Sequence, residues 1–180
     1  MSILKSAKSL LLSPRGRIAR APFLLGVLAL LALYAVQHFT YPHLGKGLMA
    51  FFVPMVFFFL NLHIIFCVFG KRLHDIGRST WPLFGMFALL FTAMMIVGLK
   101  YGMLEYFEAV HALNNDPKMQ EDLPALAAAI KPLEEAYQQT LSANMGKISV
   151  IVGSIPLVFT AWLALAKGQK ADNRYGAAPA

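Results

Sequence analysis

The stretch 48–70, LMAFFVPMVFFFLNLHIIFCVFG, decides the fold, because none of its 23 residues is Lys, Arg, Asp or Glu. A bilayer core of about 30 Å is crossed by about 20 apolar residues in a helix. Three further uncharged runs have similar length: 21–45, 79–99 and 148–166. All four are continuously apolar rather than alternating, which excludes barrel strands. We therefore predict an all-α membrane protein, a bundle of four transmembrane helices in one domain, with spans at 22–41, 48–69, 81–99 and 148–165.

The charges are distributed unevenly between the two ends of the predicted spans. The N-terminal segment 1–20, the loop 71–80 and the tail 166–180 together hold eleven basic residues, all six arginines among them, against two aspartates. The opposite side holds five lysines and seven acids. Lys and Arg accumulate on the cytoplasmic side of a membrane, so both termini are predicted to be cytoplasmic. The excess of cations also favours anionic lipid headgroups as neighbours.

Two segments outside the spans have helical patterns. In segment 1–20, the residues SILKSAKSLLL place apolar and polar side chains on opposite faces, which is typical of a short helix on the inner membrane surface. A frayed tail is the alternative for so short a segment. In segment 100–147, EYFEAVHAL predicts one helix, NNDP a turn, and apolar residues at helical spacing between 123 and 141 a second helix. We predict a helical hairpin on the periplasmic side.

The loop KRLHDIGRST, residues 71–80, follows the second span directly. Its pattern predicts that the helix continues to Asp75, where Lys71 and Asp75 stand four residues apart and can pair. Arg72 or an arginine from another segment is the alternative partner of Asp75, and His74 is expected to bond a neighbouring loop. Gly77 suits the position after a helix C-terminus, where a left-handed conformation is common. The loop is therefore predicted to begin as helix and to turn sharply at Gly77.

Three motifs fall on the predicted cytoplasmic side: GRIAR (16–20), KRLHDIGRSTW (71–81) and NRYGAAP (173–179). Together they resemble the bacterial inner-membrane family catalogued as domain of unknown function 805, and the resemblance covers Gly16 to Pro179. Thr80 and Pro82 replace a glycine and an aromatic residue often found there, and the 100–147 insert is longer than usual. The resemblance implies four helices in a bacterial inner membrane, and it implies no established activity.

Catalytic and metal-binding patterns are not found in the sequence. His74 and Asp75 are adjacent, so on a helix their side chains point about 100° apart and cannot chelate one ion together. Cys67 is the only cysteine, and no HExxH, phosphate-binding glycine loop or nucleophile elbow occurs. We predict a non-enzymatic protein without metal or cofactor. Nucleic acid is not an expected partner, since the basic charge has no recognition fold behind it.

The arginines on the predicted cytoplasmic side have two possible roles. They can form a structural clasp, or they can bind an anionic lipid headgroup, a nucleotide or an acidic membrane or cytoplasmic protein partner, because guanidinium groups bind phosphate and carboxylate in bidentate fashion. The candidate residues come from the three motifs: Arg17, Arg20, Lys71, Arg72, His74, Asp75, Arg78, Asn173, Arg174 and Tyr175.

Two alternative functions are a small transporter or channel component and a lipid-modifying membrane enzyme. Asn61 and His63 are polar residues inside the second span, where such groups are expected to face the protein interior. They either hydrogen-bond to a neighbouring helix or line a path, which would make the chain a small transporter or channel component. Gln37 and His38, near the outer end of the first span, are expected to be interfacial. A lipid-modifying enzyme would need a cleft that opens laterally at the arginine-rich side.

Overall fold

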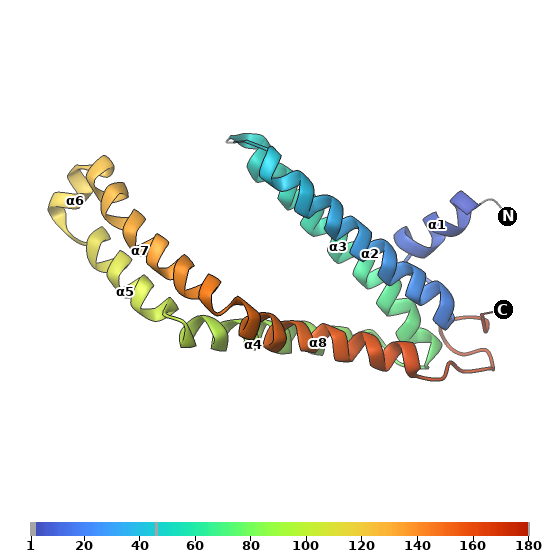
Figure 1. The fold of residues 1–180 in the computed structure, drawn as a ribbon. Coiled ribbons are helices and arrows are strands. Elements are labelled where there is room, and N and C mark those ends of the chain that lie inside the picture. Colours follow the sequence, from blue (N-terminus) through green and yellow to red (C-terminus); the bar gives the residue numbers. More distant parts are fainter. Residues whose placement is uncertain (1–2, 46, 180) are drawn as a thin grey trace. The chain divides into compact units, whose positions relative to one another are not determined.

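The computed structural model describes residues 3–45 and 47–179, and the ends of the predicted segments 1–20 and 166–180 lie outside these ranges. The described residues form helices and no strand, with one isolated bridge between Asn173 and Gly176. In order they are α1 (Ile3–Leu12), α2 (Arg20–Thr40), the 3-10 turn η1 (Tyr41–His43), α3 (Leu48–Asp75), α4 (Trp81–Lys100), α5 (Met103–Asn114), α6 (Pro117–Glu121), α7 (Leu123–Ala143) and α8 (Met145–Leu165) (Figure 1).

Four of these helices, α2, α3, α4 and α8, are long and apolar enough to cross a membrane. They coincide with the four predicted spans, and α3 continues to Asp75, as the sequence indicated. Large apolar side chains such as Leu28, Phe51, Phe91 and Val158 are exposed along them. Helices that are apolar on all sides are typical of membrane spans, where lipid covers the outer faces. The all-α class is confirmed, while the packing of all four spans as one bundle stays a prediction.

The chain divides into two compact units. Unit 1 contains the residues up to Gly85 and those from Phe159 onward, and unit 2 contains Met86–Val158. Unit 1 therefore holds α1 to α3, the first residues of α4, the last turns of α8 and the tail. Unit 2 holds the rest of α4 and α8 with α5, α6 and α7 between them.

In unit 1, α2 and α3 lie side by side along their length (Figure 1). Gly26 of α2 faces Val68 of α3 so closely that a Cβ at Gly26 would lie 2.6 Å from a Val68 methyl carbon. Small residues that let two backbones approach are typical of helix contacts in membranes. Phe23 and Phe69 meet edge to face with ring centroids 5.2 Å apart. The two helices are thus held by close packing.

The fully buried side chains of unit 1 gather near one end of this helix pair. They include Phe23, Leu73, Leu83 and Leu163, contributed by four different helices. Phe69 also stacks on Phe159 of α8, with centroids 6.1 Å apart. The three motifs adjoin this core, and we call this part of unit 1, residues 15–20, 71–80 and 163–179, the basic end.

In unit 2, α5 and α7 pack against each other, with the rings of Tyr106 and Tyr137 stacked 5.2 Å apart. The short helix α6 connects them, and Asp116 caps it by accepting a hydrogen bond from the Lys118 amide at 2.9 Å. Asp122 caps α7 in the same manner through the Ala125 amide at 3.0 Å. The helical pair predicted between 100 and 147 is present, and its side of the membrane stays a prediction.

Candidate functional site

The C-terminus of α3 positions the central motif, and Gly77 makes the turn that ends it. Gly77 has φ +77°, a left-handed conformation that glycine adopts without a Cβ clash. Its amide donates to the His74 carbonyl at 3.1 Å, and the Arg78 amide donates to the Leu73 carbonyl at 2.8 Å. These two bonds define a Schellman motif, the common way to satisfy the last carbonyls of a helix. The predicted cap at Gly77 is confirmed.

Asp75 is the single carboxylate at the centre of the basic end. Its Oδ1 accepts a hydrogen bond from Arg17 Nη2 at 3.2 Å, and its Oδ2 accepts one from Arg72 Nη1. Both pairs are almost completely inaccessible to solvent. A buried ion pair of this kind is costly to break, because the remaining partner is left as an unpaired charge.

Of the partners expected for Asp75, Arg72 and an arginine from another segment are confirmed, and the pairing with Lys71 is wrong. Lys71 Nζ instead donates to the Ser9 carbonyl at 2.5 Å and to the Leu10 carbonyl at 2.8 Å, both in the last turn of α1. Helix carbonyls at a C-terminus lack partners within the helix and attract a cation. Since two guanidinium groups already surround Asp75, Lys71 is free to hold α1 against α3.

Arg20 and Arg72 perform the same task at the C-terminus of α8. Arg72 donates from Nε to the Leu163 carbonyl at 2.9 Å and from Nη2 to the Ala166 carbonyl at 2.6 Å. Arg20 donates from Nη2 to the Leu165 carbonyl at 2.8 Å and from Nε to the Ala166 carbonyl at 3.1 Å. Two arginines from α2 and α3 thereby satisfy the carbonyls that the end of α8 leaves open.

Arg17 connects α3 with the tail. Besides Asp75, it donates to the carbonyls of Gln169 at 2.5 Å, Ala171 at 2.8 Å and Gly176 at 3.2 Å. Its Nε is buried without a hydrogen-bond partner among the described residues. A five-donor planar group suits several carbonyl oxygens at once, which an ammonium group does less well. Arg17 therefore fixes the tail to the end of α3.

His74 and the NRYG segment form a second contact between α3 and the tail. The rings of His74 and Tyr175 stack with centroids 4.0 Å apart, and the central carbon of the Arg174 guanidinium lies 4.7 Å from the centroid of the Tyr175 ring. Asn173 Nδ2 donates to the His74 carbonyl at 3.0 Å. His74 Nδ1 also lies 3.3 Å from the Gly16 carbonyl oxygen. All three motifs are therefore in direct contact, as their placement on one side of the spans predicted.

Other cations of the basic end are exposed. The side chain of Arg78, one of the predicted site residues, makes no hydrogen bond or ion pair with the residues that the structure describes, and neither do the side chains of Arg15, Lys167 and Lys170. We call these four residues and Arg174 the basic rim. Asp172, the second acid of this region, accepts a hydrogen bond from the Ala178 amide at 2.9 Å. The basic rim thus surrounds a core in which Asp75 is already paired.

A hollow of about 320 Å³ opens within the basic end. It lies between the start of α2, the end of α3 and the chain after α8, and its lining residues are Ala19, Arg20, Arg72, Asp75, Gly168, Gln169, Lys170, Ala178 and Pro179. We call it the tail hollow. Four of its lining side chains are charged, and three of those are cations.

The polar residues inside the second span contact two different neighbours. Asn61 Nδ2 donates to Gln37 Oε1 at 3.0 Å, and Tyr41 donates to the same oxygen at 2.9 Å. Gln37 is buried, and a hydrogen bond between α2 and α3 holds it between the helices. The interfacial depth expected for Gln37 and His38 stays a prediction. His63 Nε2 lies 3.1 Å from the Leu12 carbonyl oxygen and 3.5 Å from Cys67 Sγ. Asn61 and His63 therefore belong to separate hydrogen-bonded groups.

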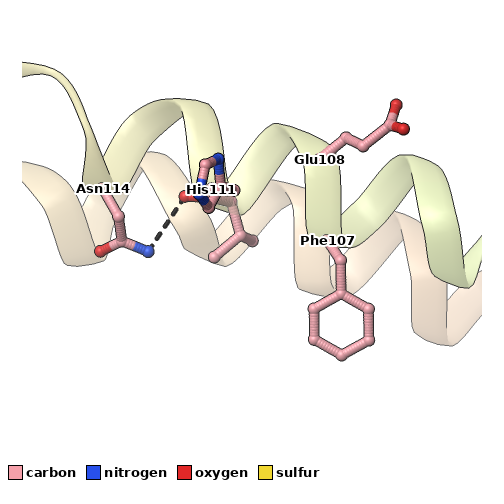
Figure 2. A pocket seen from close by; sticks show the side chains of 5 residues that line it. Phe107, Glu108, His111 and Asn114 are labelled. Atoms are coloured by element: carbon pink, nitrogen blue, oxygen red, sulfur yellow. Dashed lines mark hydrogen bonds between the residues drawn. The ribbon is translucent and has the colours of Figure 1, made fainter.

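A further hollow, of about 530 Å³, lies along α5 in unit 2. Figure 2 shows its lining side chains on this one helix, with Phe107 and Glu108 pointing to different sides. Asn114 Nδ2 donates to the Val110 carbonyl at 3.0 Å, a bond within the helix. Among the described residues, no group of three or more His, Cys, Asp or Glu side chains is arranged to hold a metal ion. Polar groups do not converge in this hollow.

Sequence reasoning missed two residues that the basic end requires, Gly168 and Gln169. A Cβ at Gly168 would overlap the Asp75 carboxylate, so only glycine fits beside it. The backbone amide of Gln169 donates a hydrogen bond to the backbone carbonyl of Asp75 at 2.9 Å, and the side-chain Oε1 of Gln169 accepts one from Asn173 Nδ2 at 2.8 Å. The one available signal was their place in KGQK, directly after the fourth span and before the third motif.

Of three comparisons with known proteins, only the comparison with family models gives a match. No curated protein and no solved structure matches the chain. One family model matches residues 11–177, a range that includes the first two motifs, residues 173–177 of the third, and all four candidate spans. The chain therefore belongs to the family described as "Protein of unknown function (DUF805)".

Proposed function

We propose that the chain is a non-enzymatic, multi-pass protein of the bacterial inner membrane whose basic end lies in the cytoplasm and binds anionic phospholipid headgroups. The α5–α7 pair then lies in the periplasm. The resemblance to an inner-membrane family supports the location, and the confinement of all six arginines to one side of the spans supports the orientation. In this proposal, Arg17, Arg72 and Asp75 form a structural clasp, which we call the arginine clasp.

The observation that carries the proposal is the division of the cations into two sets. Arg17, Lys71 and Arg72 are buried and bonded to Asp75 or to helix carbonyls. The basic rim is exposed, and the nearby carboxylate of Asp75 is already paired with two guanidinium groups. Cations near an anionic membrane surface contribute about 1 kcal/mol each to lipid attraction. The basic rim is thus available to lipid headgroups while the arginine clasp holds its scaffold in place.

Lipid selectivity of the purified protein tests the proposal. The protein is reconstituted in nanodiscs of mixed phosphatidylglycerol and phosphatidylcholine, and the lipids retained after detergent transfer are measured by native mass spectrometry. We expect enrichment of phosphatidylglycerol. Replacing Arg15, Arg78 and Lys167 by Gln should reduce this enrichment about tenfold or more, because three surface cations are lost.

The matched control removes the same number of charges from the other side of the spans, by replacing Lys100, Lys118 and Lys147 with Gln. We expect this variant to retain the phosphatidylglycerol enrichment of the unmodified protein. Equal retention of both lipids by the unmodified protein contradicts the proposal. So does an equal loss of enrichment in the two triple variants.

A further inference from the structure

We propose that the tail hollow is a binding site for the phosphate group of one anionic phospholipid molecule. This inference rests on the proposed lipid binding of the basic end and makes it specific to one site. The tail hollow has a volume of about 320 Å³, which is at the lower end of the range of small-molecule sites, roughly 300–1,000 Å³. It is large enough for a phosphate group and the adjoining glycerol.

The charges that line the tail hollow favour an anion. Its cations are Arg20, Arg72 and Lys170, and its one acid is Asp75. The Asp75 carboxylate is bonded to both Arg17 and Arg72, so its negative charge is largely offset. A cationic surplus therefore faces the tail hollow.

Two of these cations still have donors to offer. Arg20 uses Nε and Nη2 on the carbonyls at the end of α8, and its Nη1 makes no hydrogen bond with the described residues. Lys170 is exposed, and within the described part of the chain its ammonium group has no partner. A guanidinium group in a fixed position and a mobile ammonium group are a suitable pair for phosphate oxygens.

The position of the tail hollow favours a lipid phosphate over a soluble one. Arg20 is the first residue of the candidate span α2, and it bonds to Leu165, the last residue of the candidate span α8. Two spans therefore end at the rim of the tail hollow. The ends of membrane spans lie at the level of the lipid headgroups, which is where a phospholipid carries its phosphate.

The wall formed by the tail is held in place before any ligand binds. Ala178 lines the tail hollow, and its amide donates to Asp172 Oδ1 at 2.9 Å. Asn173 and Gly176 exchange two backbone hydrogen bonds, of 3.1 and 2.9 Å, in a tight turn. A site that is already ordered loses less conformational entropy on binding. The tail hollow is thus a preformed site.

The first test compares two lysines that differ only in their relation to the tail hollow. Lys170 lines it and Lys167 does not, and both are exposed without partners among the described residues. Retention of phosphatidylglycerol is measured by native mass spectrometry for Lys170→Ala and Lys167→Ala. We expect Lys170→Ala to weaken retention by about tenfold or more, since a charge-assisted bond to phosphate is lost, and Lys167→Ala to weaken it much less.

The second test leaves the charge unchanged and fills the space. Ala178→Trp places a large ring in the wall of the tail hollow, and Ala177→Trp, one residue away and outside the lining, is its control. We expect Ala178→Trp to abolish the tightly retained lipid and Ala177→Trp to leave it. The thermal unfolding midpoint of each variant in detergent shows that the fold is intact.

Three other results would overturn the tail hollow as a lipid site, the proposed lipid preference or the lipid origin of the phosphate. Equal weakening by Lys170→Ala and Lys167→Ala, or retention that survives Ala178→Trp, overturns the site while general attraction to anionic lipid stands. No preference for phosphatidylglycerol in the unmodified protein overturns the proposed function as well. If glycerol 3-phosphate displaces the lipid at equal concentration, the phosphate comes from solution and the lipid assignment fails.

Discussion

Asp75 is the residue on which the arginine clasp depends. Its carboxylate joins Arg17, from the chain before α2, to Arg72 of α3, and Arg17 in turn bonds to the tail. One buried carboxylate between two buried guanidinium groups leaves a surplus positive charge. The carbonyls of Ile18, Leu163, Ala166, Gln169 and Ala171, which these guanidinium groups also contact, stabilise that charge by accepting hydrogen bonds.

Replacing Asp75 with Asn should strongly destabilise the protein. The amide keeps the size of the side chain but leaves two buried guanidinium groups without a counter-charge, a loss of about 3–5 kcal/mol. The measurement is the free energy of unfolding in mixed detergent micelles. Glu135→Gln is the control, because the Lys131–Glu135 pair is exposed, with a distance of 3.8 Å, and pairs of this kind contribute about 0–1 kcal/mol. Similar losses in the two variants would contradict the arginine clasp.

At the residue scale, the sequence predicted which charges gather and left several possible partners for Asp75. Lys71 and Asp75 have the spacing of a helical ion pair, yet Asp75 pairs with Arg72, three residues before it, and with Arg17, 58 residues away in the chain. Helical spacing describes only neighbours on the same helix. The position of Arg17 and the carbonyls of α1 that bind Lys71 come from tertiary packing, which the spacing does not contain.

At the scale of elements, the contact between α2 and α3 depends on close packing around Gly26. A Cβ there would lie 2.6 and 2.8 Å from the two methyl carbons of Val68. Val68 is fully buried and β-branched, so it has little freedom to move aside. A methyl group in place of the Gly26 hydrogen would therefore force the two helices apart.

Gly26→Ala should destabilise the helix pair by about 1–3 kcal/mol, the usual cost of overpacking. Gly153→Ala in α8 is the control, because a Cβ at Gly153 would meet nothing within 4 Å. Alanine favours helix more than glycine does, so the control is expected to be neutral or slightly stabilising. The free energy of unfolding in mixed micelles measures both. A neutral Gly26→Ala would mean that α2 and α3 are not packed as described.

The elements themselves were largely predictable. Uncharged runs define α2, α3, α4 and α8 because charged side chains are costly in lipid, and Gly77 marked the end of the α3 helix because few other residues adopt its φ. The docking of α1 was not predictable. Lys71 and His63 contact backbone carbonyls of α1, and a backbone carbonyl has no signature in the sequence.

At the scale of the whole molecule, the distribution of charge is the main determinant of the proposed orientation. In the sequence, the segments before the first, after the second and after the fourth predicted span hold eleven basic and two acidic residues, and the segments after the first and third hold five basic and seven acidic residues. This asymmetry was readable from the sequence alone. The sequence could not show that three of the cations on the basic side are buried and bonded internally, because burial follows from packing. The tail hollow likewise results from how the tail folds back onto Asp75.

The most direct test of the account is the accessibility of single cysteines in cells. With Cys67 replaced by Ser, one cysteine is introduced at Lys118 in unit 2, at Arg78 or at Lys167, and a membrane-impermeant maleimide is added to spheroplasts or to inverted inner-membrane vesicles. We predict that Lys118→Cys reacts in spheroplasts only, and that Arg78→Cys and Lys167→Cys react in inverted vesicles only. The account would be contradicted if Lys118→Cys and Lys167→Cys reacted in the same preparation. It would also be contradicted if Lys118→Cys reacted only in inverted vesicles and Lys167→Cys only in spheroplasts.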